Sequence, residues 1–308
     1  MPSLNAKLDR LYASAPVLPF DSTSRIIMMS DCHRGQGNGA DNFLPNSSIF
    51  HGALEYYYQN GYTYIELGDG DELWENRCFD SILRTHSRTF RLMLRFLEQD
   101  RLYFLYGNHD IIKRRRSFAK QSCRTYACDH SATDENPFSR IRAEEALILE
   151  KRETLQRLFL IHGHQGSLLN DELYPLGRFL VRYLWRPLEI IGFTAPTGAG
   201  RSGKLVEKIE KQLCSYASGK NRIVIAGHTH RPVFASPGTC PYFNDGSCVH
   251  PQCITGLEID QGSISLVPVS YTHLDVYKRQ PIWASFRRTH MIPISAVFVW
   301  PCEPWPHT

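Results

Sequence analysis

Short apolar runs alternate along the chain with polar turns and with longer segments of helical spacing. Three compact apolar runs, each bounded by turn residues, are typical of buried strands: 25–30, 62–67 and 101–106. Between them, residues 49–59 and 80–99 repeat apolar positions at helical spacing, and the second segment is strongly amphipathic. The order strand, helix, strand, helix, strand predicts an α/β fold.

The second half of the chain continues with short elements. A strand pair, a helix, another strand and a β-meander are predicted at residues 146–150, 158–161, 204–216, 222–226 and 233–267. We expect one domain over residues 25–269. A short leader precedes it at 1–24, and an apolar, arginine-punctuated helical insertion interrupts it at about 168–203.

The hydrophobic pattern stops at about residue 270. The string from Val269 to Gln280 resembles translated sequencing-adapter sequence more than natural protein, and the end of the chain has no useful periodicity. We therefore predict that residues 270–308 are a tail that is not native to this fold or is disordered. Resequencing of the source DNA would check this prediction.

Composition narrows the class of protein. Hydrophobic residues make up 42% of the chain and aromatic residues 12%, which favours a packed core over disorder. The net charge of +4 does not demand a nucleic-acid partner but is compatible with an anionic substrate. With no visible signal peptide, no apolar span of membrane length and nine cysteines without a CxxC pair, the sequence predicts a cytoplasmic protein with reduced thiols.

Five predicted strands end in side chains that commonly bind metals. Each motif alone is explained by the preference of Gly, Asn and Asp for turns. Together they supply two aspartates, one asparagine and four histidines as candidate ligands: Asp31, His33, Asp69, Asn108, His162, His228 and His230. Because ligands bind outside the carboxyl ends of strands in α/β proteins, we expect these side chains to form one site.

The donor types indicate which metals would fit. Carboxylate and amide oxygens with imidazole nitrogens, and no thiolate, suit Mn²⁺, Fe²⁺ or Zn²⁺ better than Ca²⁺ or a structural zinc site. Seven ligands are too many for one tetrahedral site but are about right for two metals that share a carboxylate. Two metals about 3.5–4 Å apart form the usual clamp for phosphate-ester hydrolysis.

The motif set resembles that of the calcineurin-like metallophosphoesterases. The resemblance covers about residues 25–268 and rests on Asp31-x-His33, Gly68-Asp69-x-x-Glu72, Gly107-Asn108-His109-Asp110, His162 and Gly227-His228-x-His230. It implies a four-layer α/β/β/α sandwich with a small helical insertion.

The resemblance also implies a role for each motif residue. Asp31, His33 and His230 would hold one divalent metal ion, and Asn108, His162 and His228 the other. Asp69 would bridge the two ions, with Mn²⁺ favoured and Fe²⁺, Zn²⁺ or Mg²⁺ as alternatives. Glu72 would support the ligands from outside. His109 would stabilise charge on the phosphate or protonate the leaving oxygen.

We therefore expect a dinuclear-metal-dependent phosphoesterase that hydrolyses a phosphomonoester, phosphodiester or pyrophosphate bond. Its partner would be a small phosphorylated or nucleotide-linked substrate. The alternatives are a nuclease of the same family and a non-catalytic metal-binding scaffold. The turn from Gly68 to Trp74 and the segment 242–247 resemble the branch that contains UDP-2,3-diacylglucosamine hydrolases. Cys32 and Arg34, which flank His33, and His164 depart from that branch.

Two further segments are candidates for contact with the substrate or a membrane. Arg34, Lys113 and Arg114 are candidate substrate contacts, although a solvated face is the alternative for the basic run at 113–116. The apolar segment 176–193 could touch a membrane transiently, which would make the protein peripheral. A packed insertion or a dimer contact is the alternative, and the sequence does not predict an oligomeric state.

Overall fold

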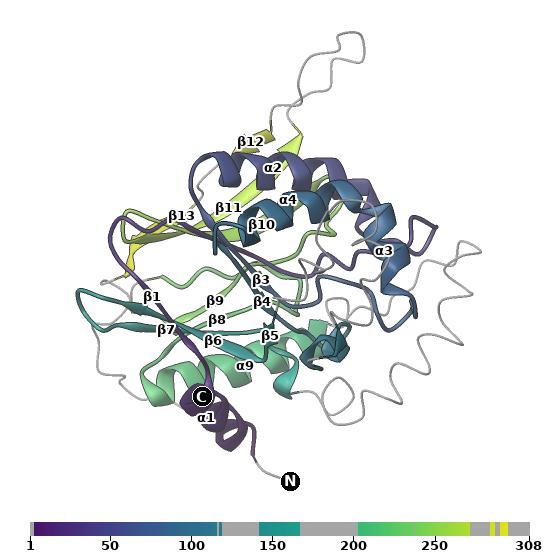
Figure 1. The fold of residues 1–308 in the computed structure, drawn as a ribbon. Coiled ribbons are helices and arrows are strands. Elements are labelled where there is room, and N and C mark those ends of the chain that lie inside the picture. The colour runs from purple at the N-terminus through teal and green to yellow at the C-terminus, as the bar shows by residue number, and fades with distance from the viewer. Residues whose placement is uncertain are drawn as a thin grey trace.

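Two β-sheets pack face to face and carry helices on their outer faces (Figure 1). The computed structural model describes residues 3–115, 117–118, 142–166, 203–236, 238–271, 284–286 and 290–294. The predicted insertion at about 168–203 lies, apart from Gly203, outside the described residues, as does the segment 176–193.

The first sheet has the strand order β1-β6-β7-β8-β9. Its strands are β1 (Val17–Phe20), β6 (Ala146–Lys151), β7 (Arg157–Ile161), β8 (Ile223–Ala226) and β9 (Tyr242–Asn244). β7, β8 and β9 run parallel to one another, whereas β6 and β7 are antiparallel.

The second sheet has the order β12-β11-β10-β2-β3-β4-β5, with β13 also paired to β11. Its strands are β2 (Ile26–Met29), β3 (Thr63–Leu67), β4 (Leu102–Leu105), β5 (Ala143–Glu144), β10 (Cys253–Asp260), β11 (Ser263–Tyr271), β12 (Ala284–Phe286) and β13 (His290–Pro293). β2 to β5 are parallel, in the register Met28 opposite Ile65 and Ile65 opposite Tyr103.

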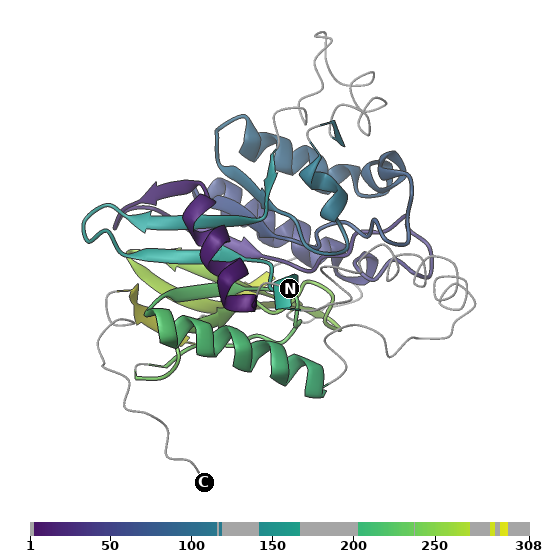
Figure 2. The same cartoon turned by 90° about the horizontal axis from the view of Figure 1, so that it is seen from below.

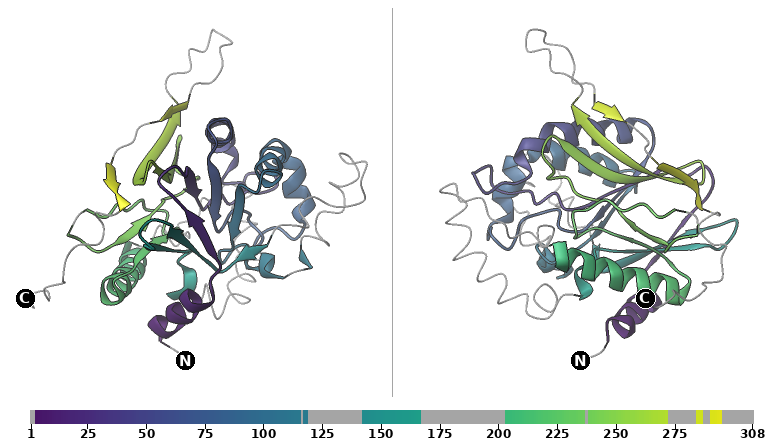
Figure 3. Two further views of the ribbon diagram at one scale, coloured as in Figure 1. Left: turned by 60° about the vertical axis from the view of Figure 1, so that its left-hand side comes forward. Right: turned by 180° about the vertical axis from the view of Figure 1, so that it is seen from behind.

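Five α-helices cover the outer faces of the sheets within the described ranges. α2 (Ser47–Gln59), α3 (Phe79–Thr85) and α4 (Ser87–Leu97) lie on the second sheet, and α1 (Leu4–Ser14) and α9 (Gly203–Lys220) lie on the first. Figure 2 shows α1 and α9 across the outer face of the first sheet, and Figure 3 shows both helical layers flanking the sheets. Short 3₁₀ turns are η1 (Leu44–Asn46), η2 (Ile111–Arg114) and η4 (His164–Gly166).

The apolar strands are buried because both of their faces are covered. Met28 of β2 and Ile65 of β3 point between the sheets, whereas Ile27 and Met29 pack against the helices. All four residues of β2 are therefore buried, which explains why the strand reads as a continuous apolar run instead of alternating. These layers confirm the predicted four-layer α/β/β/α sandwich.

The predicted helix at 80–99 differs from the structure, and residues of the predicted leader pack on the first sheet. Residues 4–20 form α1 and β1: Leu8 is fully buried, and β1 pairs in parallel with β6. The helix at 80–99 is two helices, α3 and α4, that meet at His86. The His86 ring lies 2.9 Å from a carboxylate oxygen of Asp41, and the backbone at His86 leaves the helical conformation.

Part of the predicted tail pairs with the second sheet. β12 and β13 both pair with β11, and Ile294 is fully buried in the core between the sheets. Whether residues 270–308 are native to this fold stays a prediction that resequencing would check.

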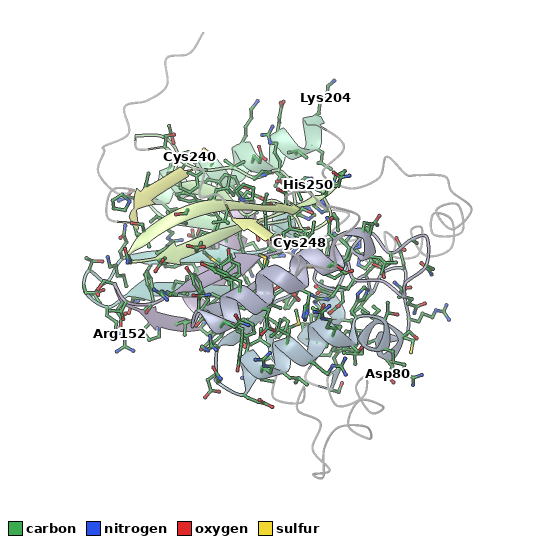
Figure 4. The ribbon with its side chains drawn as sticks, turned by 90° about the horizontal axis from the view of Figure 1, so that it is seen from above. Asp80, Arg152, Lys204, Cys240, Cys248 and His250 are labelled. Atoms are coloured by element: carbon green, nitrogen blue, oxygen red, sulfur yellow. A yellow bond between two sulfur atoms is a disulfide. The ribbon has the colours of Figure 1, made fainter. Side chains whose placement is uncertain are left out.

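The cysteines differ in part from the prediction. Cys214 of α9 and Cys240, which precedes β9, form a disulfide, with their Cα atoms 5.7 Å apart (Lys204 near the start of α9 and Cys240 are labelled in Figure 4). The prediction of reduced thiols is wrong for this pair, because packing of α9 on the first sheet brings together residues 26 positions apart. Within the described ranges, no helix is both long enough and apolar enough to cross a membrane.

Candidate active site

The predicted ligands lie at the carboxyl ends of five strands, β2, β3 and β4 in one sheet and β7 and β8 in the other. Backbone hydrogen bonds tie the loops that follow these strands to one another. The amides of Asp31 and His33 donate to the carbonyls of Gly68 and Asp69, and the amide of Gly227 donates to the carbonyl of His162. The metal-type side chains from distant parts of the chain are thereby brought to one place.

Five of the seven candidate ligands have a left-handed backbone. Their φ angles lie between 49° and 68°, at Asp31, His33, Asp69, His228 and His230. This region is uncommon for residues other than glycine, and it costs free energy that the surrounding structure must supply. Strain of this kind concentrates at functional sites. The surrounding structure therefore holds the loops in a backbone conformation that sets the direction of these side chains.

Asp31, His33 and His230 form the first group of ligands. Their ligand atoms lie within 4.8 Å of one another. Nε2 of His230 lies 3.0 Å from Oδ1 of Asp31, and Nε2 of His33 lies 3.7 Å from the same oxygen. The predicted grouping of these three residues is thus present in the geometry.

Asp69, His162 and His228 form the second group. Nε2 of His162 lies 3.1 Å from Oδ2 of Asp69, while its Nδ1 lies 2.9 Å from the carbonyl oxygen of Leu67. The Leu67 contact fixes the ring so that Nε2 faces Asp69. Oδ2 of Asp69 also lies 4.0 Å from Nε2 of His33 in the first group, so Asp69 lies between the two groups.

The turn that carries Asn108 packs against the Asp69 carboxylate. The amide of His109 donates to Oδ1 of Asp69 at 2.8 Å. A Cβ atom on Gly107 would overlap the same carboxylate, so glycine allows this close approach. Asn108 lies between these two contacts and is 1% exposed.

Several buried polar atoms fit the requirements of metal ligands. Oδ1 of Asn108 is buried and accepts no hydrogen bond in the described structure. The buried Oδ1 of Asp31 and Nε2 of His162 lie 3.0 Å from His230 and 3.1 Å from Asp69, which are themselves candidate ligands. Leaving a buried oxygen such as that of Asn108 without a partner costs free energy, and a bound ion is a common explanation. Mixed oxygen and imidazole donors with no thiolate suit borderline divalent cations. The residues present therefore fit two divalent metal ions.

Glu72 lies between two histidines of the site. Its carboxylate lies 3.0 Å from Nδ1 of His33 and 2.7 Å from Nδ1 of His109. Trp74 stacks on the His109 ring with centroids 4.4 Å apart and the planes inclined by 20°. The His109 side chain is still 22% exposed, so it remains accessible to a ligand from solvent.

A family model for calcineurin-like phosphoesterases matches residues 24–232. The chain belongs to this family. The match spans every strand-end motif from Asp31 to His230, and it confirms the family that the motifs indicated.

Two solved structures resemble this phosphoesterase chain weakly. A single mutant of Vps29 from Entamoeba histolytica has 13% identity over 86% of this chain and 99% of its own, with a TM-score of 0.33. Vacuolar protein sorting 29 from Cryptosporidium parvum has 12% identity over 86% of this chain and 98% of its own, also with a TM-score of 0.33. Likenesses this weak carry no argument about function. No curated protein matches significantly. The resemblance to UDP-2,3-diacylglucosamine hydrolases stays a prediction.

The electrostatics of this calcineurin-like site favour ionised carboxylates. Burial alone would raise the pKa of Asp31, but the imidazoles of His230 and His162 hold it well below its usual range. Burial likewise opposes ionisation of Glu72, yet His109 and His33 lower its pKa to about 2. The candidate ligand Asp31 and its neighbour Glu72 therefore both carry negative charge at neutral pH, which favours cation binding.

The pKa values of His162 and His228 are shifted in opposite directions. Burial lowers the pKa of His162, but Asp69 and Asp31 outweigh it and raise the value to about 9. Burial and the neighbouring His162 lower the pKa of His228 to about 3. His228 is thus ready to bind a metal at neutral pH, whereas His162 must first release a proton.

Two of the three predicted substrate contacts bind carboxylates of the protein itself. Arg34 is fully buried and donates to Glu66 and Asp71, and the Lys113 side chain is 9% exposed and lies 2.6 Å from Asp71. The prediction that Arg34 contacts the substrate is therefore wrong in this structure, because nearby carboxylates hold its guanidinium in the interior. The same carboxylates bind the partly exposed Lys113, whose contact with a substrate stays a prediction. Arg114 is exposed at the end of η2, and its contact with a substrate stays a prediction.

Sequence reasoning missed several residues that hold the ligand loops. Ser30 donates a hydrogen bond to the buried Asp245 at 2.8 Å and also contacts Asp31. Asn244 donates to the carbonyl of Gly227 at 2.6 Å. The only sequence signal for Asn244 and Asp245 was the resemblance of segment 242–247 to one branch of the family, because each partner lies far away in sequence.

Glu210 of α9 holds the loop that carries two ligands. It accepts a hydrogen bond from Nε of Arg231 at 3.0 Å and one from Thr229 at 3.4 Å. Thr229 lies between His228 and His230, so α9 supports this loop directly. No sequence motif indicated Glu210, because in the sequence it is one of several charged residues on a predicted helix.

Proposed function

We propose that this protein is a dinuclear-metal-dependent phosphoesterase that hydrolyses a phosphomonoester, phosphodiester or pyrophosphate bond. The observation that carries the proposal is the place of Asp69, whose carboxylate belongs to one group with His162 and His228 and also lies 4.0 Å from His33 of the other group. A shared carboxylate between two ligand groups is the arrangement that a dinuclear site needs.

The roles of the chain's own residues follow from their positions. Asp31, His33 and His230 would hold one divalent cation. Asn108, His162 and His228 would hold the second, with Asp69 between the two. When bound, the two cations would supply an activated water molecule and neutralise charge on the phosphate.

His109 is the residue best placed to move a proton. Glu72 holds its Nδ1, which leaves Nε2 to face a ligand. Burial lowers the pKa of His109, but Glu72 and Asp69 outweigh this effect and raise it. A protonated imidazole at this position donates a hydrogen bond to a phosphate oxygen and can pass its proton to the leaving oxygen.

We take the substrate to be a small phosphorylated or nucleotide-linked molecule. A substrate like that of the UDP-2,3-diacylglucosamine hydrolases is one candidate, and the fold is compatible with it. A cytoplasmic location and transient contact with a membrane through residues 176–193 remain parts of the proposal that need their own experiments.

Hydrolysis by metal-stripped full-length protein, with Mn²⁺ added back, tests the proposed function. The substrates are p-nitrophenyl phosphate, its bis ester, a UDP-sugar pyrophosphate and single-stranded DNA. We expect Mn²⁺-dependent turnover of at least one small substrate that is lost in Asp69→Asn. Preferred cleavage of the DNA would favour the nuclease alternative. Mn²⁺ binding without turnover of any substrate would contradict the proposal and favour a non-catalytic scaffold.

A further inference from the structure

Four buried charged side chains and Lys113, whose side chain is 9% exposed, lie together beside the turns that carry the candidate ligands. We call them the Arg34 cluster: Arg34, Glu66, Asp71, Asp110 and Lys113. The first four are at most 1% exposed. Burying charges costs free energy even when they are paired, and an apolar cluster of the same size is often as stable or more so. The contacts of the cluster therefore point to a purpose other than stability.

Arg34 connects the loop after β2 with the turn after β3. Its backbone amide donates to the carbonyl of Gly70 at 3.0 Å, and its carbonyl accepts from the amide of Glu72, also at 3.0 Å. Its two terminal nitrogens donate to the two carboxylate oxygens of Glu66 at 2.8 Å each. Nε donates to Asp71 at 2.7 Å. A planar guanidinium can hold two carboxylates in this fixed way, whereas an ammonium cannot.

Lys113 and Asp110 extend the cluster to the turn after β4. Nζ of Lys113 lies 2.6 Å from Asp71 and 2.7 Å from Asp110. The Asp110 carboxylate accepts hydrogen bonds from the amides of Gly70 at 3.2 Å and Gly107 at 2.7 Å. These two glycines directly follow Asp69 and directly precede Asn108. The carboxylate of Asp110 thus fastens two ligand-bearing turns to each other.

The chain leaves space for the cluster at Gly70. A Cβ atom there would overlap Oε1 of Glu66 and would lie 2.5 Å from a terminal nitrogen of Arg34. Because residue 70 is glycine, the Arg34–Glu66 pair can pack directly on the backbone of the turn beside Asp69.

The cluster does not take a third metal ion. Glu66, Asp71 and Asp110 are spaced closely enough to hold one. However, the nitrogens of Arg34 and Lys113 lie at 2.6–2.8 Å from their oxygens and take the place of a metal cation. The positive partners of these carboxylates come from the chain itself.

We propose that Arg34 is a positioning residue for the metal-binding turns. Through the other members of its cluster it fixes the spacing of the turns that carry His33, Asp69 and Asn108. The proposal rests on the proposed function, because it assigns a purpose to turns that hold the metal ions. It requires that Arg34 acts on metal affinity and on turnover without contact with the substrate.

The test is calorimetric titration of metal-stripped full-length protein with Mn²⁺, comparing Arg34→Met and Arg34→Lys with the wild type. We expect Arg34→Met to lower Mn²⁺ affinity by about 10- to 100-fold, the usual loss for a residue that supports metal ligands. The Mn²⁺ affinity of Arg34→Lys should lie between those of the wild type and Arg34→Met, because lysine keeps the positive charge but not the planar guanidinium that holds two carboxylates. With any substrate that the wild type hydrolyses, kcat should fall at saturating Mn²⁺ while KM stays unchanged.

Arg25→Met is the matched control. Arg25 is an exposed arginine that pairs with Asp260 at 3.2 Å, so its loss should leave Mn²⁺ affinity unchanged. Lys113→Met is the second test variant, since it breaks the link between Asp71 and Asp110 while Arg34 stays in place.

Wild-type Mn²⁺ affinity in a folded Arg34→Met or Lys113→Met protein would overturn the proposal. If neither variant folds, wild-type affinity in Arg34→Lys would overturn it. If the wild type binds Mn²⁺ but hydrolyses no substrate, only the proposed function is contradicted. The positioning role of Arg34 is still tested, because the Mn²⁺ titration does not depend on turnover. A wild type that does not bind Mn²⁺ overturns both.

Discussion

Oε2 of Glu72 lies 2.7 Å from Nδ1 of His109, which leaves Nε2 as the nitrogen of this ring that can meet a ligand. The same oxygen lies 3.0 Å from Nδ1 of His33. One buried carboxylate therefore orients both a candidate metal ligand and the candidate proton donor. This arrangement explains why an acid three residues after Asp69 belongs to the motif.

We expect Glu72→Gln to lower the pKa of His109. The carboxylate is the strongest influence that raises this pKa, so its loss leaves burial to depress it. The alkaline limb of the pH profile for kcat/KM should therefore move to lower pH. A titration of His109 by NMR in metal-free protein checks the same shift directly. An unmoved pKa in the variant would contradict the assigned pairing.

The same pair makes folding stability depend on pH. The pKa of His109 is raised above its usual 6.5, so this contribution is fully present below pH 6.5 and is lost as the pH rises through the raised value. The pKa of Glu72 is lowered from 4.5 to about 2, so its contribution is present above pH 4.5 and is lost as the pH falls toward 2. The free energy of unfolding of metal-free wild type and Glu72→Gln should differ most between these limits.

His109→Ala should separate catalysis from metal binding. The imidazole is partly exposed and is held by Glu72 and Trp74, whereas the two ligand groups stay complete without it. We expect Mn²⁺ binding to persist and kcat to fall by about 10²- to 10⁴-fold, the usual contribution of general acid–base catalysis. Metal analysis beside steady-state kinetics checks this. Normal turnover in the variant would remove His109 from the proposed mechanism.

Metal binding should release protons at neutral pH. The pKa of His162 is raised to about 9 by Asp69 and Asp31 against the effect of burial, so the ring is protonated in the metal-free protein. A proton and a metal compete for Nε2, so the apparent affinity for Mn²⁺ should increase as the pH rises toward 9. Calorimetry in buffers of different ionisation enthalpy counts the released protons. Affinity that does not change with pH would contradict this reasoning.

The candidate metal ligands could be placed near one another from the sequence because each one lies in the turn after an apolar strand. Strand ends of a parallel sheet meet at one edge, so Asp31, Asp69 and Asn108 had to lie near one another. The left-handed backbone of these loops could not be foreseen, since aspartate and histidine at a positive φ have no distinctive sequence signal.

Arg34 shows what the sequence alone does not determine. An arginine beside a ligand suggests contact with an anionic substrate, but its partners Glu66 and Asp71 come from another strand and turn 32 and 37 residues away. β1 was not predicted, because residues 1–24 were assigned to a leader. It lies at the edge of its sheet, where Pro19 is tolerated.

Glu210→Ala should loosen the loop that carries His228 and His230. The carboxylate side chain is 10% exposed and holds Arg231 and Thr229, and its loss leaves the Thr229 hydroxyl without this acceptor. Arg231 is 55% exposed, so water replaces part of the lost interaction, and we expect a loss of about 1 kcal/mol in the free energy of unfolding. Mn²⁺ affinity should fall as well, because the loop supplies one ligand to each group.

Glu207→Ala provides the matched control for this loop. Glu207 lies one turn away on α9, is 58% exposed and pairs only loosely with Lys211 at 4.0 Å. Its loss should change the free energy of unfolding little, because exposed ion pairs contribute little. Urea unfolding and Mn²⁺ titration of both variants separate the effect of the loop from a general effect of charge on α9. Equal results for the two variants would mean that α9 does not position His228 and His230 through Glu210.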